Sequence, residues 1–269
     1  MCNINLILRK DKHFSHAIAR VMNVMSTMSF ATNSDGEGYF GLTKDGWRFN
    51  KTVNKIIYKK AYSFLCTHQR LSTSGKNKEN NHPHITKNLI VMHNGVFSGY
   101  GDDLKSDTAY FSEKLEKNYR RSRSVIKALQ TTLKNFSGSW SLVVMDKNTG
   151  RIFYVKEDYT QMWSLSTPEY LVMSTKLWNL KYAKRYLHLK GKIKKVRSYR
   201  ILDVLNNLTV VKKLNRNQYD RWYNQPSNTK YIEAYPKYQN YGFSTGRKQA
   251  IKDAWDTVKA EEKRGYMYW

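Results

Sequence analysis

Apolar and polar positions form short alternating or clustered runs along most of the chain, a pattern that predicts many strands. Residues 3–8 alternate polar and apolar and then run apolar, as in a strand. Residues 13–28 place apolar side chains at intervals of three and four, which predicts a helix with one buried face. The other predicted strands are 36–42, 46–49, 62–67, 89–92, 139–146, 151–156 and 169–174; the other predicted helices are 107–117 and 122–133, capped by Ser106 and Ser122.

The order of these elements indicates the fold class. Strands follow one another in groups, and the helices are also grouped instead of alternating with single strands. The clearest hairpin joins residues 139–146 to 151–156 through a turn that ends at Gly150. Grouped strands and helices predict an α+β fold built of layers, not a parallel doubly wound sheet.

Charge divides the chain into two regions. The 269 residues carry a formal net charge of +26, and residues 181–269 hold 21 Lys and Arg against 7 Asp and Glu. This last region is also rich in tyrosine. We therefore expect one domain over residues 2–180 and a basic region over 181–269 that completes the fold or forms an appendage. A charge of this size favours acidic partners such as nucleic acid or nucleotides.

Cysteine content and hydropathy indicate the compartment. Only two cysteines are present, Cys2 and Cys66, too few for a disulfide framework. The apolar run over residues 4–8 is too short for a signal peptide, and no run reaches the length of a membrane span. These features predict a cytoplasmic protein.

Four separated stretches contain residues suited to catalysis. Cys2 follows the initiator methionine, so removal of Met1 would place a thiol and a free α-amine on one residue. The other three stretches are HQRLSTSG from residue 68, MHNG from residue 92 and SDT from residue 106. Each stretch alone is a weak signal, but their order and spacing together are specific.

Together the four stretches resemble the glutaminase domain of the class II glutamine amidotransferases. The resemblance covers about residues 2–180, including GSWSLVVMD from residue 138 and YLVMSTKLWNL from residue 170. It implies the N-terminal nucleophile hydrolase fold, a four-layer αββα sandwich with two antiparallel sheets. It also implies release of ammonia from L-glutamine, with no cofactor and no metal.

The resemblance assigns roles to individual residues. Cys2 matches the nucleophile that forms a glutamyl thioester, its α-amine acting as base. Asn94 and the backbone N–H of Gly95 match the pair that stabilises the oxyanion. The substrate-binding set comprises Arg70 for the α-carboxylate, Asp107 for the α-ammonium, Thr73 at the pocket wall and His93 as a shaping residue beside the pocket. Leu71, Ser74 and Ala109 depart from residues common in the family.

Other interpretations stay open at this point. The absence of an acceptor-binding module in the sequence predicts a separate synthase or a bound acceptor for the ammonia. The chain could hydrolyse another γ-glutamyl compound, or it could be an inactive binding protein of the same fold that contacts nucleic acid or an assembly partner. His68, His82, His84 and His93 could suggest a metal cluster, but their spacing matches no zinc motif.

Overall fold

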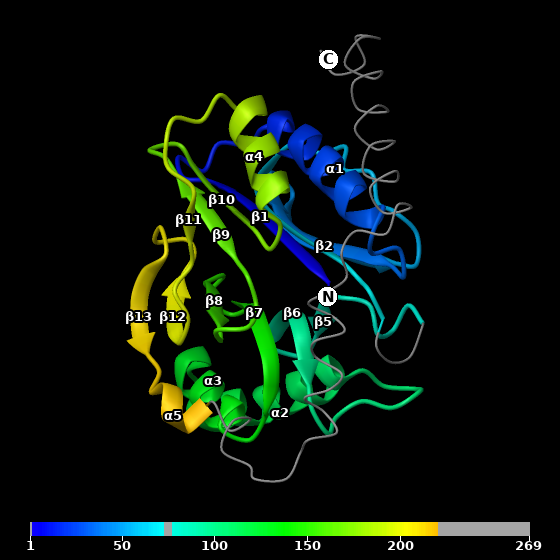
Figure 1. The fold of residues 1–269 in the computed structure, drawn as a ribbon, viewed down its shortest axis with the longest axis vertical. Helices are drawn as coiled ribbons and strands as arrows, with labels where there is room; N and C mark the ends of the chain where they lie inside the picture. Colours follow the sequence, from blue (N-terminus) through cyan, green and yellow to red (C-terminus); the bar gives the residue numbers. More distant parts are fainter. Residues whose placement is uncertain (1, 73–76, 220–269) are drawn as a thin grey trace.

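The computed structural model describes residues 2–72 and 77–219, which form two stacked antiparallel sheets (Figure 1). The seven-stranded sheet has the order β11-β9-β10-β1-β4-β2-β3, and the six-stranded sheet has the order β13-β12-β8-β7-β6-β5. The strands are β1 (Asn3–Arg9), β2 (Glu37–Thr43), β3 (Gly46–Thr52), β4 (Tyr62–Gln69), β5 (His84–Ile85), β6 (Leu89–Phe97), β7 (Gly138–Asp146), β8 (Ile152–Lys156), β9 (Trp163–Ser166), β10 (Tyr170–Ser174), β11 (Lys194–Lys195), β12 (Arg200–Asp203) and β13 (Thr209–Lys213). The helices are α1 (His16–Phe30), α2 (Asp107–Ser122), α3 (Val125–Leu133), α4 (Leu177–Tyr186) and α5 (Arg216–Tyr219).

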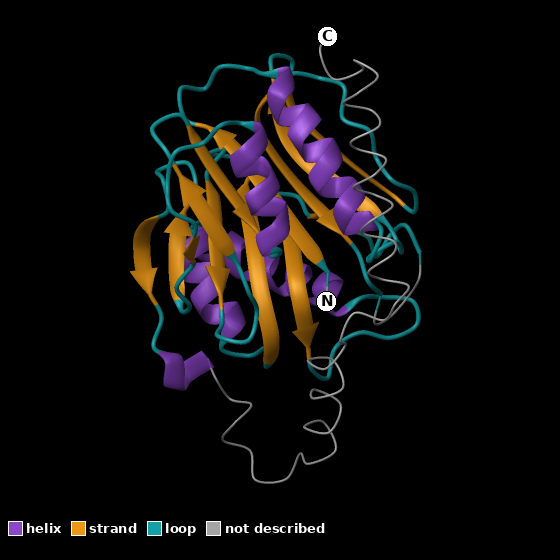
Figure 2. Cartoon of the chain, turned by 45° about the horizontal axis from the view of Figure 1, so that its top comes forward, coloured by secondary structure: helices purple, strands orange, loops and turns teal. Residues whose placement is uncertain are grey.

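Three groups of buried apolar side chains hold four layers together. One group joins α1 and α4 to the outer face of the seven-stranded sheet, and a second joins α2 and α3 to the outer face of the six-stranded sheet. The third fills the space between the sheets, where Leu6, Phe64 and Met92 lie. Helices therefore flank the strands on both sides (Figure 2). This αββα sandwich confirms the predicted fold class.

Strand β1 lies inside the seven-stranded sheet, where β10 pairs with it on one side and β4 pairs with it on the other. It is antiparallel to β10 and to β4, with Leu6 opposite Met173 and Cys66. Its side chains alternate between the two faces, as a strand requires. Ile4 and Leu6 face the space between the sheets, whereas Asn3 and Asn5 contact Ser29 of α1.

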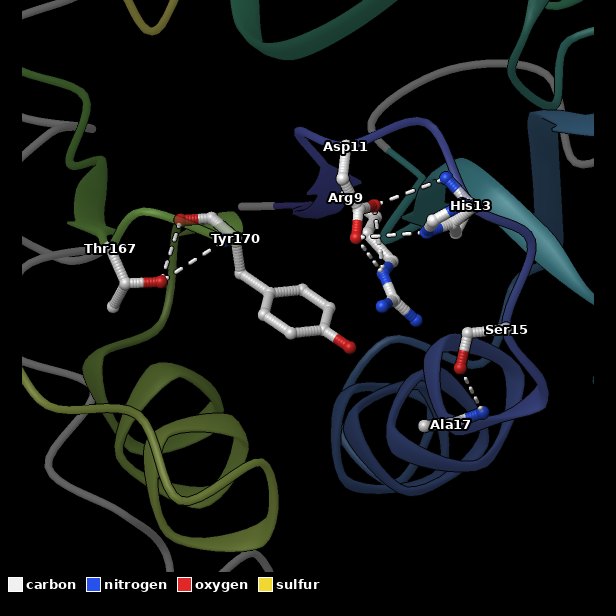
Figure 3. A network of polar contacts seen from close by, with 7 residues as sticks. All are labelled: Arg9, Asp11, His13, Ser15, Ala17, Thr167 and Tyr170. Atoms are coloured by element: carbon white, nitrogen blue, oxygen red, sulfur yellow. Dashed lines mark hydrogen bonds and ion pairs between the residues drawn. The ribbon is translucent and has the colours of Figure 1, made fainter.

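The far end of β1 leads into α1 through a short polar turn (Figure 3). Asp11 accepts a hydrogen bond of 2.9 Å from Arg9 Nε and one of 3.1 Å from the backbone N–H of His13. The hydroxyl of Ser15 then accepts from Ala17 N at 3.1 Å and caps the helix. Capping sets the first residue of α1 at His16, three residues later than the sequence pattern indicates.

Several other sequence predictions about element ends are wrong, among them the end of β6 and the start of α3. The strand predicted to end at Met92 continues to Phe97, because β6 pairs with β7 along its entire length. The helix predicted to start at Ser122 starts at Val125. Ser122 is the last residue of α2, and Ser124 caps α3 by accepting from Lys127 N at 3.4 Å.

The region after residue 180 contributes to both sheets. Strand β11 pairs with β9 at one edge of the seven-stranded sheet, and β12 and β13 extend the six-stranded sheet beyond β8. The tyrosine-rich part of the predicted basic region lies outside the described residues. Among the helices that the structure describes, none combines the length and apolar character needed to cross a membrane.

Candidate active site

The start of β1, the end of β4, the middle of β6 and the start of α2 meet around one cavity. It encloses about 300 Å³, including the part open to solvent. Its position follows from the topology, because β1 and β4 are antiparallel neighbours, with Asn3 opposite Gln69. The lining residues are Cys2, Arg70, Leu71, His82, His93, Gly95, Ser106, Asp107 and Thr108.

The Cys2 thiol lies against the backbone of Leu71. The Leu71 N–H donates to Sγ at 3.4 Å, and the thiol donates to the Leu71 carbonyl at 3.6 Å. Cys2 is only 9% exposed, and this burial raises the pKa of its thiol, while the nearby positive charge of Arg70 acts in the opposite direction. A raised thiol pKa means that a base must take the proton before sulfur can attack.

The Arg70 side chain is buried at the cavity, where an arginine on the surface would be exposed. Its backbone N–H donates to the Gly36 carbonyl at 2.8 Å, fixing the chain just beyond β4. Its Nη1 donates to Asn81 Oδ1 at 3.2 Å. Asn81 in turn fills the space beside Gly36, where an added Cβ would lie 2.0 Å from Asn81 Nδ2. A guanidinium held in this way can bind a carboxylate through two parallel hydrogen bonds.

Asp107 is the first residue of α2, and the protein holds its carboxylate in place. Phe97 N donates to Oδ2 at 2.7 Å, and Thr108 N donates to Oδ1 at 2.7 Å. Ser106 caps the helix by accepting from Ala109 N. The carboxylate therefore contributes a fixed negative charge to a cavity that Arg70 also lines.

Asn94 and Gly95 belong to β6, beyond the strand end at Met92 that the sequence pattern predicts. Gly95 has φ of +149°, and an added Cβ would lie 2.0 Å from the Ser139 carbonyl oxygen, so only glycine fits. Asn94 is buried beside it. Within the described residues Asn94 does not line the cavity, and its Oδ1 has no hydrogen-bond partner.

His93 links β6 to both α2 and β7. Its Nε2–H donates to the Ser139 carbonyl at 3.3 Å, and its Nδ1 accepts from the Thr108 hydroxyl at 2.8 Å. The acceptor at Ser139 fixes the tautomer. Burial lowers the pKa of His93, which therefore favours the neutral form. The remaining predicted pocket residue, Thr73, lies outside the described residues.

His82 is a cavity residue to which sequence reasoning gave no role. It is 4% exposed, and in the described part of the chain neither ring nitrogen has a partner. Its ring lies 3.9 Å from that of His68 and 4.8 Å from that of His84, measured between centroids. The HPH sequence was a detectable signal. Among the described residues, no three or more His, Cys, Asp or Glu side chains are arranged to hold a metal ion.

A polar row crosses the six-stranded sheet beside the cavity, and sequence reasoning missed it as well. Asn94 pairs with Ser141 on β7, and Ser141 pairs with Lys156 on β8. The Ser141 and Tyr154 hydroxyls are 2.8 Å apart. Lys156 is fully buried and donates to Ser198 Oγ at 2.8 Å, and desolvation lowers its pKa to about 8. The row places a positive charge two strands away from Asn94.

Sequence comparison finds relatives of one enzyme type. The chain is 30% identical over 160 residues to glutamine–fructose-6-phosphate aminotransferase (isomerizing) of Buchnera aphidicola from Acyrthosiphon pisum, covering 53% of this chain and 26% of the relative. It is 28% identical over 155 residues to the Vibrio cholerae enzyme of the same name, covering 51% and 25%. The chain thus spans about a quarter of these curated relatives. No family model matches.

Solved structures share the fold at low sequence identity. Glutamine phosphoribosylpyrophosphate amidotransferase from B. subtilis, in complex with ADP and GMP, aligns with a TM-score of 0.58 and 12% identity, over 80% of this chain and 49% of that one. A structure described as the allosteric regulatory enzyme of purine biosynthesis aligns with a TM-score of 0.60 and 14% identity, over 80% and 49%. The chain is thus similar in sequence to glutamine-dependent aminotransferases, and it shares the N-terminal nucleophile hydrolase fold of the glutamine amidotransferase structures.

Proposed function

We propose that the chain hydrolyses the side-chain amide of L-glutamine and releases ammonia. The supporting observation is that a thiol, a guanidinium and a carboxylate from three separate segments, Cys2, Arg70 and Asp107, line the same cavity. An anion-binding group and a cation-binding group in one cavity suit the two charges of an α-amino acid. The thiol beside them is a nucleophile for an amide at the end of the side chain.

In the proposed reaction, removal of Met1 frees the α-amine of Cys2. This amine takes the thiol proton, and Sγ attacks the amide carbon to form a tetrahedral oxyanion. Collapse of that intermediate breaks the C–N bond, and the protonated amine gives its proton to the departing ammonia. Water then hydrolyses the thioester to give glutamate and restores the thiol. Because burial raises the thiol pKa, an adjacent base matters more here than at an exposed cysteine.

Asn94 and Gly95 are the proposed donors to the oxyanion. Gly95 lines the cavity, and its missing side chain lets β6 pack closely against the Ser139 carbonyl. The Asn94 amide follows His93, whose ring is held on both sides. One oxyanion donor is typically worth about 10²- to 10³-fold in kcat. His93 and Thr73 are proposed to shape the pocket, and Arg70 and Asp107 to bind the substrate charges.

We propose that the ammonia passes to an acceptor held by a synthase domain or by a partner, outside the cavity at Cys2. The relatives' names specify fructose 6-phosphate, but this chain matches only about a quarter of their length. We propose a cytoplasmic location, which the two free thiols, Cys2 and Cys66, support.

Intact-mass spectrometry with 6-diazo-5-oxo-L-norleucine, a glutamine-analogue electrophile, tests the proposal. We expect a chain that lacks methionine and gains one adduct, with no adduct in Cys2→Ala. Cys66→Ala is the matched control, since Cys66 is fully buried between the sheets, and it should label like the wild type. A chain that loses Met1 but stays unlabelled, or that labels equally in Cys2→Ala, contradicts the proposal.

A further inference from the structure

Positive charge is concentrated on the last described part of the chain. Residues 181–219 contain twelve Lys and Arg and a single acidic residue, Asp203. Asp203 is fully buried, and Arg151 Nη2 donates to it at 2.8 Å. No acidic side chain within residues 181–219 is therefore exposed to balance the twelve cations.

The charges gather where both sheets end on one side of the sandwich. Lys194 and Lys195 form β11, an edge strand that pairs with β9, while Lys212 and Lys213 end β13, the edge strand that pairs with β12. Arg197 lies in the short connection from β11 to β12. All five side chains are exposed, and we call this set the basic edge. Figure 1 places β11, β12 and β13 together, away from the N-terminus.

The basic edge is not neutralised by the part of the chain that the structure describes. Among the ion pairs of the described residues, none involves Lys194, Lys195, Arg197, Lys212 or Lys213. Unpaired charges of one sign repel one another when they lie within a Debye length of about 8–10 Å. A cluster of this kind produces a positive potential that attracts polyanions and speeds their association.

The chemistry of the basic edge fits a phosphate backbone better than an acidic protein. A stable protein interface has an apolar core with aromatic anchors. Here the exposed large apolar side chains are Leu205 and Val210, and Tyr199 is buried. Phosphate contacts need cations and backbone N–H groups, which edge strands supply. With few exposed rings to stack on bases, the binding should not depend on nucleotide sequence.

We propose that the basic edge is a nucleic-acid-binding surface that contacts the phosphate backbone. This surface is distinct from the cavity at Cys2 and does not rest on the proposed glutaminase activity. The five side chains come from two edge strands and their connection, so several of them can contact phosphates of one nucleic acid. Such binding is dominated by counterion release and weakens steeply with salt.

Fluorescence anisotropy with a labelled 20-base-pair DNA duplex of mixed sequence, at 50 to 300 mM NaCl, tests the proposal on the full chain. About five phosphate contacts should give a slope of log K against log salt of about −4 to −5. The variant Lys194→Gln/Lys195→Gln/Lys212→Gln/Lys213→Gln should make the slope of log K against log salt shallower by about 3 to 4. It should also weaken binding at least tenfold at 100 mM NaCl. Residues 220–269 are present in every protein compared.

The matched control removes the same charge elsewhere. Lys114, Lys117, Lys127 and Lys134 are exposed on or next to α2 and α3, and their fourfold Gln variant should keep nearly wild-type affinity. Equal losses in the two variants, or no binding at 50 mM salt, would overturn the proposal. Poly-L-glutamate of equal charge that competes as well as unlabelled DNA would also overturn it, because the surface would then fit acidic protein. Far-UV circular dichroism should be the same in all three proteins, which checks folding independently of the glutaminase activity.

Discussion

The two helical layers cover their sheets with different chemistry. Under α2 and α3 the outer face of the six-stranded sheet is packed with aromatic side chains, and Phe111 stacks on Phe97 at 4.6 Å between centroids. Under α1 the outer face of the seven-stranded sheet is polar at the end near Cys2. There Asn3, Asn5 and Gln69 form hydrogen bonds with groups of α1 and of the strands.

Glu37 is the centre of the polar side. This fully buried carboxylate accepts from the Tyr58 hydroxyl at 2.7 Å, from Gln69 Nε2 at 2.9 Å and from Ile56 N at 2.7 Å, and it also accepts from Ser26. Gln69 lies directly before Arg70 in the chain. Hydrophobic packing is non-directional, whereas hydrogen bonds fix orientation. The comparison indicates that directional contacts hold the segments that carry Cys2 and Arg70.

The largest expected effect comes from the apolar side. Phe111→Ala should lower the free energy of unfolding by about 3–5 kcal/mol, because it leaves a cavity in a close-packed layer. Urea unfolding measures this loss. The rate of labelling by the glutamine analogue, corrected for the folded fraction, should stay within about twofold of the wild type because Phe111 packs behind β6 and does not line the cavity. A large fall in the corrected rate would show that the apolar layer also orients the site.

A smaller stability loss with a larger effect on labelling is expected on the polar side. Glu37→Gln keeps the shape but sets an amide donor against existing donors, which should cost about 1–3 kcal/mol. The corrected labelling rate should fall more than in Phe111→Ala, because Gln69 shifts and Arg70 follows it in the chain. Labelling equal to that of Phe111→Ala would mean that the polar network only stabilises the fold.

The smallest expected effect is a change in how the free energy of unfolding depends on pH, and it concerns His68 and His84. Burial lowers the pKa of His68 and of His84 to about 3, from 6.5. Below pH 6.5 the unfolded chain therefore binds more protons than the folded chain, and stability falls as the pH falls from 6.5 towards 3. Each ring should contribute up to about 1.4 kcal/mol per pH unit.

Urea unfolding at pH 7, 6, 5 and 4.5 checks this slope. His84→Gln should make it shallower by up to about 1.4 kcal/mol per pH unit below pH 6. The control His188→Gln alters an exposed ring that water hydrates in both states, so its slope should match the wild type. Equal slopes in all three proteins would mean that acid opens the cavity wall locally before global unfolding.

Much of the fold was readable from local pattern. The alternation over residues 3–8 predicted β1, and the spacing of apolar residues predicted α1 to within three residues at its start. The prediction failed where two signals competed. Asn94 and Gly95 have the composition of a turn, but pairing with β7 continues the strand through them. Ser122 and Ser124 are both good caps, and the end of α2 decided between them.

The sequence by itself determined the identities and order of the candidate catalytic residues and the sign of the charge on the last third of the chain. Tertiary structure alone decided which groups meet. It brought the Leu71 backbone to the Cys2 thiol, His82 to the cavity wall and Asn81 against Arg70. It also gathered separated lysines at the ends of two sheets. Local pattern depends on neighbours a few residues apart, whereas antiparallel pairing joins segments many residues apart, such as β1 and β10.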